Sequence, residues 1–269
     1  MKSVRDRVVL ITGGGSGIGR LTALDFAGRG ARVVVWDLNQ EALKQTEAGA
    51  AEKGLSIRTM ICDVSSREDV YRQAESLVRE TGPVDILINN AGVVSGKPML
   101  ETPDDLIEKT MRVNILALFW TAKAFLPGMI ERNSGHIVNI SSAAGLIGVR
   151  GLADYCASKF AVYGFNESIR MELRRIKSRV RTTVVCPFFI DTGMFSGVKT
   201  RFPLLLPILK SPYVAKKIVI AVLKNKNQLV LPRFAGTIFI LRLFPPALID
   251  AAAGFFGISR AMDEFKGKA

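Results

Sequence analysis

The chain has 269 residues, 48% of them hydrophobic, which is enough for one α/β domain with a substantial core and excludes a disordered chain. Its formal net charge is +13, and 11 of its Lys and Arg against 3 Asp and Glu follow residue 200, a balance that suits nucleic acid or anionic lipid headgroups. Three scattered cysteines without a CxxC pair predict buried, reduced thiols, and His136, the single histidine, opens an apolar strand, so we expect no metal site.

The first predicted elements are a strand, a glycine turn and a helix. The β-branched run RVVLIT is followed by GGGSGIG and then by a segment of helical periodicity at 21–30. Glycines let the backbone turn tightly against a pyrophosphate, and a helix N-terminus favours its negative charge. The pattern TGxxxGxG in this setting predicts a dinucleotide site. We expect Thr12, Gly13, Ser16, Gly17, Ile18 and Gly19 at the cofactor.

The second strand, ARVVVWD, predicts which dinucleotide is bound. It ends at Asp37, 18 residues after Gly19, close to the spacing of the acid that holds the adenosine ribose. A carboxylate there accepts hydrogen bonds from the ribose hydroxyls and repels a 2′-phosphate. Gly15 and Ser16 have no positive charge that would attract such a phosphate. We therefore expect NAD rather than NADP, with Leu38 also at the cofactor. Asp37 equally suits the N-cap of a helix over 38–54.

The next elements continue the alternation. A strand over 56–64 ends at Asp63 and Val64, which we expect at the adenine. An amphipathic helix over 65–82 opens with a serine cap and closes at a glycine. The strand DILINNAG then brings three small residues beside the cofactor: Asn90, Ala91 and Gly92.

The alternation continues to residue 187 and predicts the fold class. A long helix over 113–133 carries Asn114 near its start, and the strands HIVNISS and VRTTVVCP flank one further helix. Strands rich in Val and Ile that alternate with helices predict a doubly wound (Rossmann) α/β fold: a parallel sheet of about seven strands with helices on both faces. Ligands of such sheets bind at the carboxyl ends of the strands. Thr12, Asp37, Asp63, Asn90, Ser142 and Pro187 all fall at those ends.

A serine, a tyrosine and a lysine between residues 141 and 159 predict acid–base chemistry. Tyr155 and Lys159 are four residues apart and share one face of a helix, while Ser142 ends the preceding strand. An ammonium beside a phenol lowers its pKa from about 10, so that the phenolate can accept a proton from an alcohol. A serine hydroxyl can bind the same substrate oxygen.

Taken together, these motifs resemble the short-chain dehydrogenase/reductase family over roughly residues 5–230: TGGGSGIG, Asp63-Val64, NNAG, Asn114, Ser142 and YCASK are in family order. The resemblance implies a catalytic set of Asn114, Ser142, Tyr155 and Lys159 and hydride transfer at nicotinamide C4. It implies that Tyr155 is the acid/base, that Lys159 binds the nicotinamide ribose and lowers the pKa of Tyr155, and that Asn114 supports a relay water. It also places Pro187, Ile190 and Thr192 against the nicotinamide.

A finer resemblance is to the retinol and 17β-hydroxysteroid dehydrogenases of endoplasmic reticulum and lipid droplets. It is carried by VVVWDLN, FWTAKAFLPGM, HIVNISSAAG, YCASKFAVYGF and CPFFIDTGM. The chain and this subgroup share one departure from the broader family: the residue after Pro187, usually glycine, is a phenylalanine, here Phe188. The chain begins MKSVRDR, without a signal peptide or leading membrane span, so we expect a cytoplasmic location, peripheral on a membrane or lipid-droplet surface.

The last third of the chain is the substrate end of the expected single domain, residues 1–269. Residues 187–212 form an apolar, proline-rich segment where the family has a substrate lid, which suits a hydrophobic alcohol or ketone. Residues 232–262 are an apolar extension that Arg233, Arg242, Pro245-Pro246 and Asp250 divide into pieces too short to span a bilayer. We expect short helices on a membrane surface; the alternative is a buried subunit or substrate contact.

We therefore expect an NAD-dependent oxidoreductase of steroids, retinoids or long-chain alcohols. The alternatives are a 3-oxoacyl-thioester reductase, which Asp37 disfavours, and a cofactor-bound membrane-surface protein with little activity, which the intact catalytic set disfavours. A nucleic-acid partner is not expected, because the basic residues lie among leucine and proline rather than in a recognition motif. By the resemblance, the protein is a homodimer or homotetramer through the helices that carry Asn114 and Tyr155.

Overall fold

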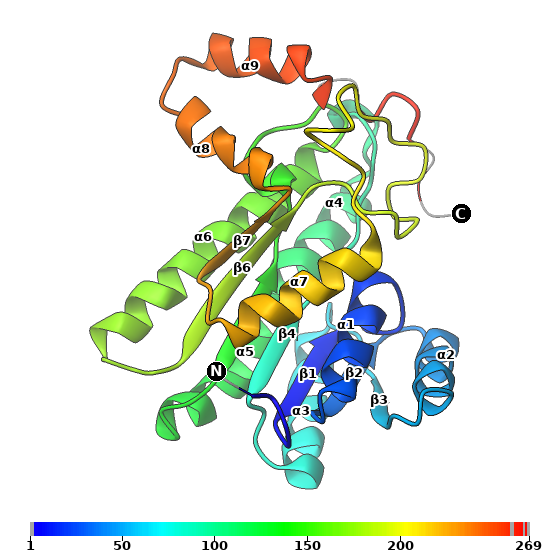
Figure 1. Cartoon of the computed structure of the whole chain (residues 1–269), viewed down its shortest axis with the longest axis vertical. Coiled ribbons are helices and arrows are strands. Elements are labelled where there is room, and N and C mark those ends of the chain that lie inside the picture. Colours follow the sequence, from blue (N-terminus) through cyan, green and yellow to red (C-terminus); the bar gives the residue numbers. More distant parts are fainter. Residues whose placement is uncertain (1–2, 259–260, 266, 268–269) are drawn as a thin grey trace.

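A seven-stranded parallel sheet forms the centre of the molecule, as the sequence predicts (Figure 1). The computed structural model describes residues 3–258, 261–265 and 267. The strand order is β3-β2-β1-β4-β5-β6-β7, so the chain reverses direction across the sheet between β1 and β4. Such a switch point is where doubly wound folds bind their ligands. The strands are β1 (Val8–Thr12), β2 (Arg32–Asp37), β3 (Ile57–Ile61), β4 (Ile86–Asn89), β5 (His136–Ile140), β6 (Arg181–Pro187) and β7 (Gln228–Leu231).

Helices cover both faces of the sheet and bury the Val- and Ile-rich strands (Figure 1). One core cluster lies between the sheet and α1, α2 and α7, and another lies between the sheet and α3, α5 and α6. Phe26 of α1 and Leu77 of α3 are fully buried on opposite faces. These helices are α1 (Gly17–Gly28), α2 (Gln40–Ala51), α3 (Arg67–Thr81), α4 (Asp104–Met111), α5 (Ala117–Glu131), α6 (Ala153–Arg175) and α7 (Ser211–Leu223).

The ends of α3 follow the capping pattern expected from the sequence. The Ser66 side chain accepts a hydrogen bond from Asp69 N, at 3.2 Å, and satisfies one of the unpaired N–H groups of the first turn. Gly82 ends the helix with a φ of 80°, a conformation that glycine adopts without strain.

The helix that carries Asn114 begins earlier than predicted. α4 continues through a π-helical turn, Arg112–Leu116, into α5, so one helical run extends from Asp104 to Glu131 rather than over 113–133. In the described part of the chain, this run is long and apolar enough to cross a membrane by length and composition. It serves the core here, because Phe125 and Met129 are buried against the sheet.

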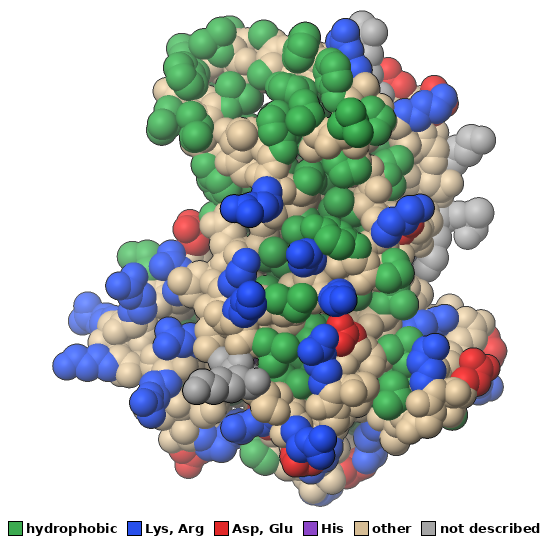
Figure 2. All heavy atoms as spheres, viewed as in Figure 1, with side chains coloured by type: hydrophobic (Ala, Val, Ile, Leu, Met, Phe, Trp, Pro, Cys, Tyr) green, Lys and Arg blue, Asp and Glu red, His purple; other side chains and the backbone are tan. Residues whose placement is uncertain are grey.

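The residues after β6 form two further parts. The lid segment, residues 187–212, contains bends and turns, and an isolated bridge between Ile190 and Leu209 joins its two ends just before α7. After β7, residues 232–258 form the C-terminal cap, which stands above the carboxyl ends of the strands (Figures 1 and 2). It contains the 3₁₀-helix η4 (Arg233–Thr237), α8 (Ile238–Leu241) and α9 (Pro246–Phe255). Residues 259 and 260 of the predicted extension 232–262 lie outside the described residues, and the boundaries of lid and extension stay predictions.

Candidate active site

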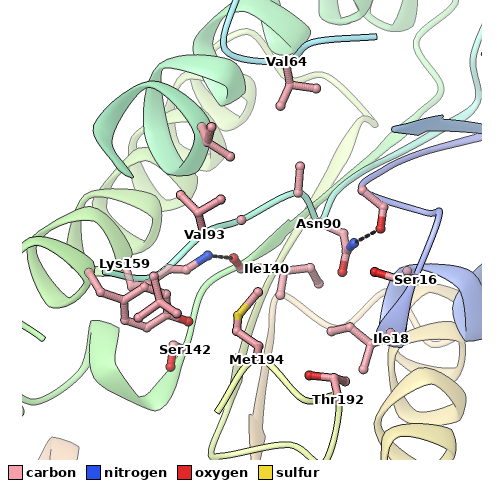
Figure 3. Close-up of a pocket in the computed structure, with 18 of the residues that line it drawn as sticks. Ser16, Ile18, Val64, Asn90, Val93, Ile140, Ser142, Lys159, Thr192 and Met194 are labelled. Atoms are coloured by element: carbon pink, nitrogen blue, oxygen red, sulfur yellow. Dashed lines mark hydrogen bonds between the residues drawn. The ribbon is translucent and has the colours of Figure 1, made fainter. Parts of the chain in front are cut away.

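A cavity of about 990 Å³ opens at the carboxyl ends of the strands (Figure 3). It extends from the glycine turn before α1 to the lid segment. All residues expected at the cofactor line it except Thr12, and of the four expected catalytic residues Asn114 alone does not line it. The ends of six strands, β1 to β6, thus bring together residues from Gly13 to Pro187.

The glycine turn leaves no room for side chains where it meets β4. A Cβ on Gly19 would lie 2.3 Å from Gly13 O and 2.5 Å from Asn90 Nδ2. Gly17 has a φ of 54°, in the left-handed region that glycine tolerates. The backbone at the start of α1 therefore approaches β4 closely. The first residues of α1, whose N–H groups have no partner within the helix, line the cavity, an arrangement that suits a phosphate.

Thr12 lies beneath the turn rather than in the cavity. It is buried, and its Oγ1 accepts hydrogen bonds from the backbone N–H groups of Asn90 and Ala91 at 3.0 and 3.1 Å. The Asn90 side chain donates in return to the carbonyls of Thr12 and Gly13 (Figure 3). These bonds join the end of β1 to the end of β4, so Thr12 holds the glycine turn in place, and its expected contact with the cofactor stays a prediction.

Asp37 is positioned by backbone N–H groups at the end of β2. Its carboxylate accepts hydrogen bonds from Gly15 N at 2.9 Å and from Asn39 N at 3.0 Å. The N-cap of α2 is Asn39, whose side chain accepts from Ala42 N, so Asp37 does not cap this helix as the sequence also allowed. Asp37 lines the cavity together with Leu38.

The region expected at the adenine is formed by β3 and α4. Asp63 accepts hydrogen bonds from the N–H and hydroxyl of Ser65, at 2.8 and 2.6 Å, and Val64 faces the cavity (Figure 3). Sequence reasoning missed the opposite wall, because nothing in the run TPDDLIEKTMR marks it as part of a pocket. That wall is formed by Asp105, Glu108, Lys109, Arg112 and Val113.

Ser142, Tyr155 and Lys159 meet at the other end of the cavity. Lys159 Nζ donates a hydrogen bond to Ile140 O at 3.0 Å and lies 5.5 Å from the centroid of the Tyr155 ring (Figure 3). Ser142 follows β5, and its hydroxyl accepts from Ala144 N at 3.1 Å. Tyr155 and Lys159 are 5% and 4% exposed, so both reactive groups are shielded from bulk water.

The pKa of Tyr155 departs from the sequence-based expectation. Burial raises it above its usual range, and hydrogen bonding with Ser142 counteracts this shift. Burial also lowers the pKa of Lys159, to about 8, so it acts against the charged form of both groups. A phenol with a raised pKa is protonated at neutral pH.

Asn114 connects the loop after β4 with α6 instead of lining the cavity. Its Oδ1 accepts from Val93 N at 2.8 Å, and its Nδ2 donates to Val93 O at 2.9 Å and to Ser158 Oγ at 3.0 Å. It lies in the π-helical turn, a feature often found at functional sites. Asn114 thus fixes the loop after β4 against α6, and its expected role with a relay water stays a prediction.

The lid segment lines the end of the cavity that contains Tyr155. Pro187, Ile190 and Thr192 line it, and Thr192 lies at the glycine turn, where a Cβ on Gly17 would be 3.4 Å from its Cγ2. Phe195 contacts the Tyr155 ring edge-on, with centroids 5.7 Å apart.

The C-terminal segment also reaches this end, which the sequence did not reveal because MDEFKGKA reads as a charged tail. Phe265 lines the cavity 6.3 Å from the Phe195 ring centroid. Ion pairs of Asp263 with Arg150 and of Glu264 with Lys199 fix this segment.

The remaining titratable side chains singled out by the sequence are structural. Cys62, Cys156 and Cys186 are buried free thiols, and burial raises their pKa values. His136 is buried with Nε2 2.7 Å from Thr183 Oγ1. Among the described residues, no group of three His, Cys, Asp or Glu side chains could hold a metal ion.

Comparison with known proteins places this geometry in context. Residues 7–201 match the short chain dehydrogenase family model. The chain is 50% identical over 267 residues to epidermal retinol dehydrogenase 2 of Homo sapiens, covering 98% of this chain and 86% of the relative. A short chain dehydrogenase/reductase from Burkholderia phymatum in complex with NAD aligns with a TM-score of 0.81 at 27% identity, covering 90% of this chain and 95% of the other. A metagenomic short-chain oxidoreductase in complex with NADP aligns with a TM-score of 0.71 at 28% identity, covering 85% and 97%.

Proposed function

Because the chain belongs to the short-chain dehydrogenase/reductase family, we propose that it transfers a hydride between NAD and a lipophilic alcohol or ketone, with Tyr155 as the acid/base. The observation that carries the proposal is that Ser142, Tyr155 and Lys159 line the same cavity as the glycine turn. The substrate class is a steroid, a retinoid or a long-chain alcohol.

The chain's residues are suited to hold the dinucleotide. The Gly13–Gly19 turn presents backbone N–H groups to a pyrophosphate, and Asp37 presents a carboxylate to the adenosine ribose hydroxyls. A lysine ammonium has three N–H donors. The bond to Ile140 O uses one of them, which leaves others to bind the nicotinamide ribose. When bound, the nicotinamide accepts or supplies the hydride.

Tyr155 and Ser142 handle the substrate oxygen. In reduction, the protonated Tyr155 donates its proton to the ketone oxygen as the hydride arrives at the carbonyl carbon. In oxidation, Tyr155 first releases its own proton to solvent, and the resulting phenolate accepts the proton of the alcohol as the hydride leaves. Ser142 donates a hydrogen bond to the oxygen as its charge changes. Lys159, with a pKa near 8, is mostly cationic at neutral pH and stabilises the phenolate that each turnover requires.

The preference for NAD rests on Asp37 and on the absence of Lys and Arg side chains where the described residues of the glycine turn and β2 line the cavity. Arg20, which follows the glycine turn, does not line the cavity, and its guanidinium donates to Gly15 O and to Gln45. The basic residues that line the cavity, Lys109 and Arg112, belong to the wall formed by α4 and the π-helical turn. A 2′-phosphate would meet the Asp37 carboxylate with no cationic side chain of this part of the lining beside it.

The choice of a lipophilic substrate rests on the walls of the cavity beyond Tyr155. They are formed by Val94, Met194, Phe195 and Phe265. An apolar pocket with a few convergent polar groups suits an alcohol on a hydrocarbon skeleton. A polar acyl carrier or an extended thioester would leave its amides unpaired against these walls.

A substrate screen tests the proposal. The chain with NAD is expected to form NADH with retinol, hydroxysteroids or long-chain alcohols. Ser142→Ala is expected to lower kcat/KM by about 100-fold, because one hydrogen bond to the reacting oxygen is lost. Activity with 3-hydroxyacyl thioesters alone, or a lower KM for NADP than for NAD, would contradict it.

The cap is proposed to contact a membrane. Ile240, Leu243 and Phe244 are 64%, 82% and 50% exposed, and the cap's outer surface is largely apolar (Figure 2). Asp250 is the single acidic residue in 232–258, and Lys and Arg side chains lie below the apolar surface on the same face (Figure 2). Apolar residues inserted among acyl chains, with cations at the level of anionic headgroups, would give peripheral attachment.

Self-association is proposed through α5 and α6. Phe119 and Met171 are 46% and 65% exposed on these helices, which suits burial in a homodimer or homotetramer. Light scattering of the purified chain would test this, and a monomer at all concentrations would contradict it.

A further inference from the structure

A second, smaller cavity lies between the C-terminal cap and the loops around Ser142. Its volume is about 80 Å³, roughly the space that three water-sized groups occupy in a liquid. Its walls come from the loop after β5, the lid segment and the cap. The lining residues are Ala143, Leu146, Ile147, Val149, Phe188, Phe189, Leu206, Phe234, Ala235, Thr237, Ile238, Leu241, Ala252, Ala253, Phe256 and Ile258.

This cavity is separated from the active-site cavity by aromatic side chains. Phe188 lines both cavities, and Ala143 directly follows Ser142 in the chain. Phe189 contacts Phe188 edge-on at 4.7 Å between centroids and contacts Phe195 at 5.2 Å. Phe195 in turn contacts Tyr155. The partition therefore consists of phenylalanine side chains and of the start of the 3₁₀-helix Ala143–Gly145.

The lining suits an apolar group. Among the described residues that form it, Thr237 alone has a polar side-chain atom, and its hydroxyl donates to Phe234 O at 2.8 Å. Only this hydroxyl oxygen can still accept from water, so water gains few hydrogen bonds from these side chains. A hydrocarbon chain or ring would replace this empty space with van der Waals contacts.

Small side chains create the space. Ala252 and Ala253 of α9 and Ala235 of η4 face it, while larger residues of the cap pack at its edges. The lid and cap are held together around the cavity by Phe202, whose ring lies 5.4 Å from Phe255 and 5.8 Å from Phe256. The cap thus forms an apolar roof over this cavity.

We propose that this cavity is a subsite for the non-reacting hydrocarbon end of the substrate, which passes Phe188 while its hydroxyl carbon stays at Tyr155. The inference rests on the proposed oxidation of lipophilic alcohols. It predicts that the enzyme favours long substrates over short ones and that residues of the cap set this preference, although none of them lines the active-site cavity.

The test is a series of straight-chain alcohols from butanol to decanol with NAD, using the full chain. Ala253→Leu adds three carbons to the cavity wall, and Ala251→Leu places the same side chain on an exposed position of the same helix. The ratio of kcat/KM for decanol to that for butanol is expected to fall at least tenfold in Ala253→Leu, because each buried methylene contributes about a factor of four. Ala251→Leu is expected to match the wild type. Ala235→Leu, on a different element, provides a second filled cavity if the first variant is unstable.

The unfolding temperature with added decanol separates this inference from the proposed function. If no alcohol is oxidised, yet decanol raises the unfolding temperature of the wild type and of Ala251→Leu but not of Ala253→Leu, the subsite stands and the proposed reaction falls. An unchanged decanol-to-butanol ratio in Ala253→Leu and Ala235→Leu, together with equal stabilisation by decanol, would overturn the subsite.

Discussion

The cofactor side of the molecule and the C-terminal cap use their side chains in opposite ways. Around the glycine turn, polar groups such as Thr12, Asp37 and Asn90 are bonded to backbone N–H and C=O groups of neighbouring strands. In the cap, large apolar residues such as Leu243 and Phe244 point outward. The first region is complete within the chain, whereas the second has apolar surface that the chain itself does not cover. The difference indicates that the cofactor side is fixed by folding and that the cap is adapted to its surroundings.

Replacing Gly19 with alanine is expected to break the cofactor side with the largest effect. Its Cβ would lie 2.3 Å from Gly13 O, so the turn must shift away from the cavity. We expect the Kd for NAD, measured by calorimetry, to rise at least about 100-fold, or roughly 2.7 kcal/mol. Gly49→Ala in α2, where an added Cβ meets nothing within 4 Å, is the control and should bind NAD normally. Equal affinities in the two variants would contradict the close approach.

Charging the cap tests the other half of the comparison. Leu243→Glu with Phe244→Glu is expected to weaken binding to phosphatidylcholine vesicles containing phosphatidylserine by about 100-fold, since each side chain contributes roughly 1.5 kcal/mol or more on burial. Val78→Glu with Ile176→Glu, on α3 and directly after α6, replaces partly exposed apolar residues away from the cap. Sedimentation with vesicles is the measurement, and equal pelleting of both double variants would remove the membrane proposal.

His136 gives the sheet an acid sensitivity that the cap lacks. Burial lowers its pKa to about 3, so in acid the unfolded chain takes up a proton that the folded chain does not. Stability from this group is complete above its unfolded pKa of about 6.5 and falls as the pH drops toward 3. At pH 5 the loss is about 2 kcal/mol. His136→Gln should reduce the difference in unfolding free energy between pH 7 and pH 5 by that amount in urea titrations, and an unchanged difference would contradict it.

Asp37→Asn is expected to have the smallest effect and sharpens the cofactor assignment. Asparagine can still accept the hydrogen bond from Gly15 N but carries no charge, so repulsion of a 2′-phosphate is lost. The ratio of kcat/KM for NAD to that for NADP should fall about tenfold, or roughly 1.4 kcal/mol. Asp25→Asn, which removes a surface charge on α1, should leave the ratio unchanged. A wild type that already prefers NADP would contradict the assignment.

The same contrast decides what could be predicted from sequence. The strands, the sheet class and the glycine turn were predictable because runs of β-branched residues, and turns that need glycine, fit few other structures. The breaks at Arg242 and Pro245-Pro246 predicted short helices in the cap, but an apolar run such as FAGTIFILRLF fits a core helix, a pocket roof or a membrane surface equally well. Phe265 was missed because it lies in a charged segment, far in the sequence from the other cavity residues, and no local pattern indicates the ion pairs of Asp263 and Glu264 with distant residues. Sequence spacing shows the cation beside Tyr155 but not the burial of both groups, which raises the pKa of Tyr155 and lowers that of Lys159.

Tyr155→Phe tests the central claim most directly, because it removes one hydroxyl and leaves the ring that packs against Phe195. Tyr163→Phe, on the same helix, is the matched control, since its hydroxyl is 3.3 Å from Gln228 Oε1 at the edge of the sheet. With a saturating lipophilic alcohol and NAD, kcat is expected to fall at least about 1,000-fold in Tyr155→Phe while the Kd for NAD changes little and Tyr163→Phe behaves as the wild type. Turnover by Tyr155→Phe at the rate of the Tyr163→Phe control would show that another group moves the proton.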